Sequence, residues 1–171
     1  MLTKQQLDSF KPWIISVIKT GSQTLDWIKG SRDCDYIFYV VDNTDVENVT
    51  RLFAMREKEC WGISNYNYVV RPYSYQYNFA ELVYGDDFPK FNIFDNLEEY
   101  KRCLIKKGLN KPKTQRKDWY HVLTGIYFID NGEFRLTEQQ KDNINVCHDK
   151  KMTTEIYEFI QQRLQEYADE Q

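Results

Sequence analysis

The first hydrophobic periodicity lies in residues 3–18. Apolar side chains recur there at the three- and four-residue spacing of one helical face: Leu7, Phe10, Ile14, Val17 and Ile18. The pattern predicts a helix over roughly 3–18. Thr3 is the predicted N-cap, because its hydroxyl can accept a hydrogen bond from the first helical turn. The Thr-Gly-Ser sequence at 20–22 ends the predicted helix.

A dense run of strand-forming residues, Tyr-Ile-Phe-Tyr-Val-Val, follows at 36–41. It predicts a strand covered on both faces, because a half-exposed strand would alternate apolar with polar residues. Residues 44–59 predict a helix. The stretch 60–80 is rich in Tyr and Asn and predicts one or two strands around Tyr66 and 68–70.

Two more strands are predicted at 81–84 and 88–94, joined by a Gly-Asp-Asp turn. Helical patterns then dominate, and the predicted helices cover 96–107, 117–130, 137–148 and 153–168.

Several polar residues mark where these helices begin. Asn96 is the predicted cap of the first, and Thr153 starts the last. Thr137 and Gln140 have the spacing of a capping box. Strands that give way to helices predict an α+β fold. We expect a core of mixed sheet with flanking helices over 1–100, and a basic linker with a C-terminal helical region over 101–171, packed on the core.

The composition indicates a folded, soluble protein. Hydrophobic residues make up 42% and aromatic residues 16% of the 171 positions, which argues against disorder. No apolar run approaches the roughly 18 residues of a membrane-spanning helix. Residues 1–13 lack the apolar centre of a signal peptide. We therefore expect a cytoplasmic protein with no membrane partner.

Charge is distributed unevenly behind a net value of -3. Residues 101–117 carry eight basic and no acidic side chains, whereas 1–100 have a net charge of -5 and 118–171 a net charge of -6. Such a segment is either a solvated loop or a contact for phosphate. A nucleic acid is thus a candidate partner for residues 101–117.

The cysteines do not indicate a metal site. The four cysteines are widely spaced, without a Cys-x-x-Cys pair: Cys34, Cys60, Cys103 and Cys147. They predict reduced, mostly buried thiols rather than a zinc site. The sequence contains no serine-hydrolase, zinc-protease or phosphate-loop motif.

The most informative residues precede the apolar strand. Asp33 and Asp35 are two positions apart at its start, so both carboxylates face the same side of an extended chain. Paired carboxylates suit Mg²⁺ (or Mn²⁺), which prefers oxygen ligands and often binds substrate phosphates as well. Gly21 permits a tight turn, and Ser22 offers a hydroxyl and an N–H group to a phosphate. Together these residues predict a site for a nucleoside triphosphate and its metal ion.

This arrangement resembles the DNA polymerase β-like nucleotidyltransferase superfamily, in which a Gly-Ser pair is followed, after about ten residues, by Asp-x-Asp and a strand. The resemblance is closest to the small nucleotidyltransferase-like proteins of bacteriophages and bacteria. It rests on five matching positions: Gly21, Ser22, Asp33, Asp35 and Tyr36. The stretch 117–123 is also similar to the Lys-x-hydrophobic-Tyr-His-x-Leu helix of these proteins, and Asn-Gly-Glu-Phe at 131–134 fits the sequence that follows it.

The resemblance implies a Mg²⁺-dependent nucleotidyltransferase that moves a nucleoside monophosphate from a triphosphate to an acceptor, in the host cytoplasm if a phage encodes it. Asp33 and Asp35 would be the catalytic metal ligands. Gly21 and Ser22 would contact the phosphates, and Lys101 or Lys106 would neutralise the outer phosphate charge.

The chain departs from the family pattern at the third carboxylate. Family enzymes place it on a neighbouring strand, where this sequence aligns Asn92, which cannot act as a general base. Asp95 and Glu81 are the alternatives if the register differs. Two other functions therefore stay open. One is a catalytically degenerate member that binds a nucleotide, a nucleic acid or a host protein, and the other is an unrelated interaction domain.

Overall fold

The computed structural model describes residues 2–30, 34–42, 45–53, 59–67, 75–114 and 118–171. Their contacts divide the chain into two units. The first unit comprises 1–26, 31–71 and 76–91, and the second comprises 27–30, 72–75 and 92–171. Strands occur in the first unit and four consecutive helices in the second, which confirms the predicted α+β class.

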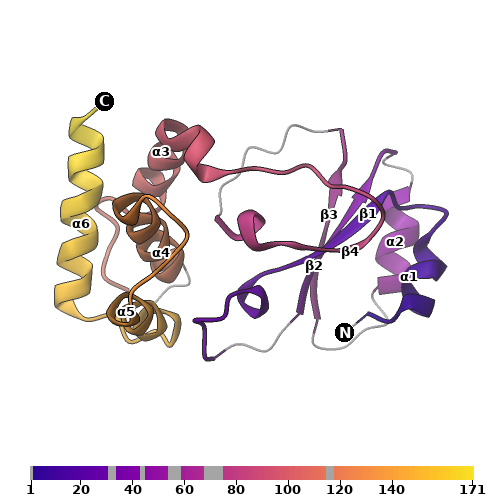
Figure 1. Ribbon diagram of the computed structural model, residues 1–171, viewed down its shortest axis with the longest axis horizontal. Helices are drawn as coiled ribbons and strands as arrows, with labels where there is room; N and C mark the ends of the chain where they lie inside the picture. The colour runs from indigo at the N-terminus through magenta and orange to yellow at the C-terminus, as the bar shows by residue number, and fades with distance from the viewer. Residues whose placement is uncertain (1, 31–33, 43–44, 54–58, 68–74, 115–117) are drawn as a thin grey trace. The chain divides into compact units, whose positions relative to one another are not determined.

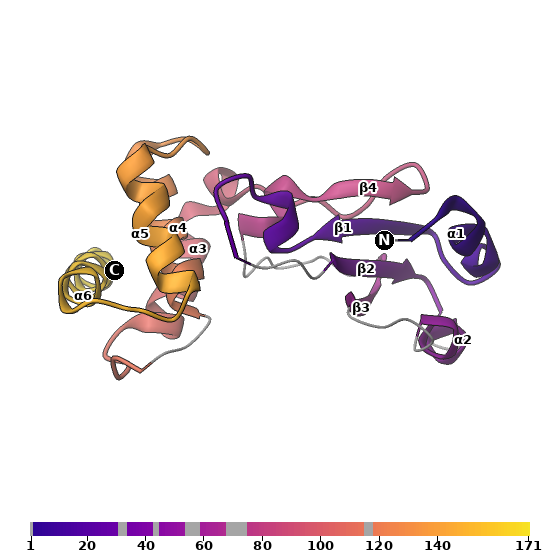
Figure 2. The same ribbon diagram turned by 90° about the horizontal axis from the view of Figure 1, so that it is seen from below.

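A four-stranded mixed sheet forms the first unit, in the order β3-β2-β1-β4 (Figure 2). Its strands are β1 (Ser16–Thr20), β2 (Cys34–Val40), β3 (Glu59–Asn65) and β4 (Glu81–Tyr84). β1 runs antiparallel to both β2 and β4, whereas β2 and β3 are parallel. The strands predicted at 36–41 and 81–84 are thereby confirmed.

Both faces of this sheet are covered. Val17 pairs with Phe38 on one face, where Leu7 and Val49 belong to the same core. These two residues come from the helices α1 (Lys4–Phe10) and α2 (Asp45–Phe53), which are labelled in Figure 1. Ile18, Tyr39 and Phe88 form a second core on the opposite face. β2 is thus covered on both faces as predicted, although Ile37 is only half-buried and Val41, after the strand, is exposed.

The first helix is much shorter than predicted, because α1 ends at Phe10 and residues 16–20 form β1. Pro12 explains the break, since its ring clashes with the carbonyl four residues earlier and it has no N–H to donate. The β-branched residues that follow it suit an extended chain. The Thr3 cap is confirmed, because its hydroxyl accepts a hydrogen bond from the Gln6 N–H at 3.2 Å.

The middle of the chain also differs from prediction. The helix predicted at 44–59 is α2, and residue 59 already belongs to β3. Within 60–80, a 3₁₀ helix, η2 (Tyr75–Phe79), follows β3, and the predicted strand centre at 68–70 lies outside the described residues.

The strand predicted at 88–94 is wrong. This stretch is irregular until η3 (Ile93–Asn96), another 3₁₀ helix. Pro89 lacks a ladder donor, and the Asn92 side chain accepts a hydrogen bond from the Phe94 N–H at 2.8 Å, which starts the 3₁₀ turn.

The second unit contains the predicted helices (Figure 1). They are α3 (Leu97–Gly108), α4 (Asp118–Asn131), α5 (Glu138–His148) and α6 (Thr154–Asp169). The predicted caps at Thr137 and Thr153 both accept the expected backbone hydrogen bonds. Asn96 occupies the N-cap position of α3, but its side chain donates instead to the Asn92 carbonyl at 3.1 Å.

α4 is the most buried of the four helices, with nine buried residues that include Trp119 and Phe128. Among the described residues, no helix is both long enough and apolar enough to cross a membrane.

Candidate functional site

The Gly21–Ser22 turn lies at the end of β1 and has a conformation that requires glycine. Gly21 has φ 85° and ψ -169°, a combination that residues with a β-carbon essentially do not adopt. Its carbonyl accepts hydrogen bonds from the Thr24 N–H at 3.1 Å and the Thr24 hydroxyl at 2.7 Å. The turn thus leads directly into η1 (Ser22–Thr24), and Ser22 itself is buried.

Strand pairing brings Asp35 to this turn. In the β1–β2 ladder, Thr20 pairs with Asp35, so the residue after Thr20 lies beside the start of β2. A β-carbon built on Gly21 would overlap Asp35 Oδ2 and lie 2.7 Å from Asp35 Cγ. The half-buried carboxylate therefore occupies the space that any side chain at position 21 would need.

A second contact fixes the same two segments. The Cys34 thiol donates to Gln23 Oε1 at 2.8 Å, which links η1 to the first residue of β2. The geometry of Gly21, Ser22 and Asp35 is thus held by both the strand ladder and a side-chain contact. It is a set of oxygen-bearing groups on a rigid support, chemically suited to a hard divalent cation and a phosphate.

Of the other predicted site residues, one is not described by the structure and two belong to the second unit. Asp33 falls outside the described residues, so only Asp35 of the carboxylate pair has a described place. Lys101 and Lys106 lie on α3 in the second unit. The Lys101 ammonium is 3.2 Å from Glu170 Oε2, whereas Lys106 is exposed.

The strand predicted to carry the third carboxylate does not exist, so the placement of Asn92 on it is wrong. Asn92 starts η3, and Asp95 lies within that 3₁₀ helix. Glu81 does lie on a strand, but it pairs with Lys19 rather than with Thr20. Because successive residues of a strand alternate between faces, Glu81 projects from the face opposite to Asp35.

The neighbouring strand on the other side of β2 is β3. Its first two residues, Glu59 and Cys60, are in register with Cys34 and Asp35. Glu59 is therefore an acidic residue at the same end of the sheet as Asp35. Glu59 is not among the predicted site residues, because the helix predicted over 44–59 includes it. The alternation of Trp61 and Ile63 with Gly62 and Ser64 is the one sequence pattern here that indicates a strand.

Among the described residues, no group of three or more His, Cys, Asp or Glu side chains is arranged to hold a metal ion. Comparisons with protein-family models, with curated proteins and with solved structures found no match to this chain.

Proposed function

We propose that this chain is a Mg²⁺-dependent nucleotidyltransferase, which moves a nucleoside monophosphate from a nucleoside triphosphate to an acceptor that is still to be identified. One observation supports the proposal most strongly: the ladder between β1 and β2 holds the Gly21–Ser22 turn against the Asp35 carboxylate. A carboxylate next to a glycine-serine turn can serve a metal ion and a phosphate together.

Each residue of the site has a proposed role. Asp35, together with Asp33, would hold Mg²⁺ or Mn²⁺, and the metal ion would neutralise charge on the triphosphate. Gly21, whose conformation brings the turn against Asp35, would contact the phosphate together with Ser22, and Ser22 would donate a hydrogen bond to it. Lys101 and Lys106 stay as predicted contacts of the outer phosphates. In the transfer, the acceptor oxygen forms a bond to the α-phosphorus while pyrophosphate leaves.

A second candidate function is nucleotide binding without turnover. Two observations favour it: the oxygen of the Asn92 side chain is used in capping η3, and Glu81 projects from the face opposite to Asp35. Neither residue supports a general base for the acceptor hydroxyl. In such a degenerate member, the same turn would hold a nucleotide as part of an interaction with a nucleic acid or a host protein.

The basic segment supports a nucleic acid as the partner or acceptor. Residues after α3 are fixed to α6, because the Tyr157 hydroxyl donates to the Lys111 carbonyl at 2.6 Å and Lys113 Nζ donates to Thr154 Oγ1 at 2.8 Å. Lys111 is exposed, as are Lys150 and Lys151 just before α6. Lysines from two separate segments thus flank the start of α6, a surface suited to a phosphate backbone.

Calorimetric titration with each nucleoside triphosphate and Mg²⁺ tests the nucleotide site. The wild type, Asp35→Asn and the control Asp26→Asn should be compared, because Asp26 is an exposed carboxylate outside the site. We expect binding by the wild type and the control, and a loss of about tenfold or more in Asp35→Asn. Absence of binding by the wild type would exclude both nucleotide functions, and unchanged binding by Asp35→Asn would move the site elsewhere.

The position of a radiolabel in the triphosphate then distinguishes nucleotidyl transfer from binding without turnover. Triphosphate labelled at the α-phosphate should transfer its label to a component of cell extract, whereas γ-label should leave with pyrophosphate. Transfer that depends on Asp35 supports the enzyme. Binding without any transfer of the α-label supports nucleotide binding without turnover.

A further inference from the structure

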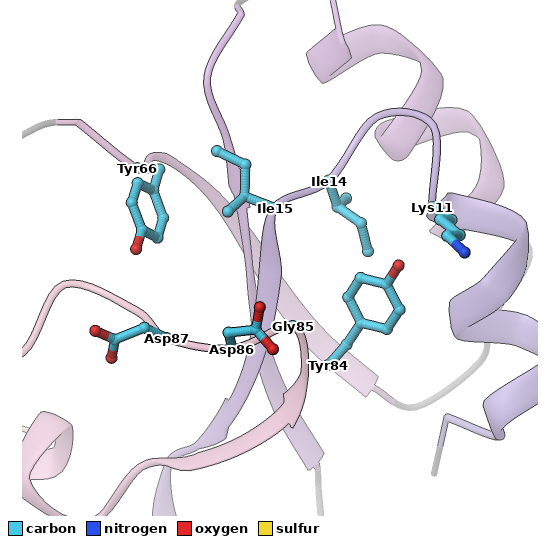
Figure 3. A pocket seen from close by; sticks show the side chains of 8 residues that line it. All are labelled: Lys11, Ile14, Ile15, Tyr66, Tyr84, Gly85, Asp86 and Asp87. Atoms are coloured by element: carbon cyan, nitrogen blue, oxygen red, sulfur yellow. The ribbon is translucent and has the colours of Figure 1, made fainter.

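An open cavity lies in the first unit, at the end of β1 opposite to Gly21 (Figure 3). Its volume is about 640 Å³, within the range of small-molecule sites. Three segments line it: the connection from α1 to β1, the residue after β3, and the end of β4. The lining residues are Lys11, Ile14, Ile15, Tyr66, Tyr84, Gly85, Asp86 and Asp87.

Backbone packing fixes the acidic side of this cavity. Gly85 has φ 88°, and a β-carbon built on it would lie 2.5 Å from the Ile15 carbonyl oxygen. The turn that carries Asp86 and Asp87 is therefore pressed against the chain just before β1. No residue other than glycine would allow this approach without moving the turn.

Aromatic packing fixes another wall. The ring of Tyr66 meets that of Tyr39 edge-on, with 6.2 Å between centroids. Tyr39 is fully buried and stacks on Phe88 with 6.5 Å between centroids. The packing of Tyr66 on the buried Tyr39 thus fixes its ring. Figure 3 shows Tyr66 and Tyr84 on opposite sides of Asp86.

The two carboxylates of the turn differ in their partners. Asp87 lies 3.4 Å from the Lys90 ammonium, which also lies over the ring of Phe88 at 5.5 Å from its centroid. The Phe88 N–H and Lys90 keep the pKa of Asp87 below its usual value. Asp86 has no such cation within ion-pair distance among the residues that the structure describes. Asp87 is thus paired with the Lys90 ammonium, whereas the Asp86 carboxylate lines the cavity without such a cation among the described residues.

We propose that this cavity binds a small organic cation, an ammonium or guanidinium group, with Asp86 as its counter-ion and the rings of Tyr66 and Tyr84 as its walls. A carboxylate between aromatic faces attracts a cation both by charge and through the ring quadrupoles. An anion would meet two carboxylates there, and Lys11 lies beyond Tyr84, away from Tyr66 (Figure 3). The site is at the other end of β1 from Gly21 and does not depend on the proposed nucleotide chemistry.

Binding of matched ligands tests this assignment. The probes are the peptide acetyl-Gly-Arg-Gly-amide, its citrulline counterpart and free agmatine, titrated into the full chain and followed by calorimetry and by amide chemical shifts. Citrulline keeps the shape of arginine but removes its charge. We expect the arginine peptide, agmatine or both to bind, and to shift the amides of residues 84–87, whereas the citrulline peptide should bind at least about tenfold more weakly. The relative affinities of peptide and agmatine then assign the source of the cation.

Three variants make the test specific to the cavity. Asp86→Asn should weaken binding about tenfold, because a charge-assisted contact is lost. Tyr66→Leu should weaken it about threefold through loss of a cation–π contact at an open site. Asp26→Asn, an exposed carboxylate outside the cavity, should bind as the wild type does. Equal binding of the arginine and citrulline peptides, unchanged binding by Asp86→Asn, or no binding of either cation by the wild type would overturn the proposal.

Discussion

At the scale of single residues, Gly21 and Asp35 depend on each other. The strand ladder brings Asp35 beside the turn, and the missing side chain at position 21 leaves room for its carboxylate. The sequence predicts that both residues belong to one site, but it does not predict the contact between them. It follows from the pairing of Thr20 with Asp35.

Substitution of Gly21 tests this dependence. In Gly21→Ala, the backbone conformation alone should cost of order 1–3 kcal/mol of unfolding free energy. Displacement of the Asp35 carboxylate should add to that cost and abolish triphosphate binding. Urea unfolding and calorimetric titration measure the two effects.

Two other glycines supply the controls for this experiment. Gly132 has φ 69° but nothing lies within 4 Å of a β-carbon built on it, so Gly132→Ala reports backbone strain without a clash. Gly62 lies in β3 and is also open, so Gly62→Ala should be neutral or slightly stabilising. Gly21→Ala could lower the free energy of unfolding no more than Gly132→Ala does and still bind nucleotide. In that case the contact between position 21 and Asp35 would not be needed for stability or for binding.

At the scale of elements, sequence patterns predicted the helical second unit well and the first unit only in part. The helices α3 and α6 could be predicted because apolar residues recur at helical spacing over several of their turns. The helix predicted through residues 14–18 is wrong, because short apolar runs fit either period and Pro12 prevents α1 from continuing. The pairing of β1 with β2, which brings Gly21 beside Asp35, could not be predicted from the sequence, because strand register depends on contacts between residues distant in the chain.

One helix contact in the second unit makes a clear prediction. Gly125 lies in α4, where a β-carbon built on it would be 2.5 Å from the Tyr100 hydroxyl and 3.1 Å from Leu104 Cδ2 on α3. An alanine in place of a helix glycine usually stabilises by about 1 kcal/mol. Gly125→Ala should instead destabilise the protein by about 1–3 kcal/mol, because it separates two packed helices.

The double variant separates the overlap from other effects. Tyr100→Phe removes the nearest atom, so Gly125→Ala should cost measurably less in that background. A double-mutant cycle from urea unfolding, followed by tryptophan fluorescence, gives the coupling energy. Additive effects would mean that the Tyr100 hydroxyl does not limit the approach of α3 and α4.

At the scale of the whole molecule, buried phenol groups occur in both units. Burial raises the pKa of six tyrosines above the ordinary value: Tyr39, Tyr75, Tyr77, Tyr100, Tyr127 and Tyr167. Four of them are almost completely buried, at no more than 2% exposure: Tyr39, Tyr75, Tyr100 and Tyr167. Such groups contribute to the cores only while they stay neutral, since a phenolate cannot be accommodated there without solvation.

The sign of the resulting pH dependence is fixed by where the proton binds more tightly. Above about pH 10 the phenols of the unfolded chain ionise, whereas those of the folded chain keep their protons. The folded state then binds more protons, so its stability falls as the pH rises. The Cys147 thiol acts in the same direction from about pH 9, because burial raises its pKa to about 12.

We therefore expect the free energy of unfolding to fall steeply between pH 10 and pH 11.5, by about 1.4 kcal/mol per pH unit for each phenol that stays neutral in the folded chain. Urea unfolding over this range gives the free energy, and absorbance at 295 nm counts the phenolates. Cys147→Ala removes the thiol contribution and leaves the phenol contribution intact. Because the buried phenols can ionise only when their unit opens, their absorbance change should coincide with the loss of helical circular dichroism. If all tyrosines ionised near pH 10 while the circular dichroism stayed native, the interiors of the two units would not exclude water around these side chains.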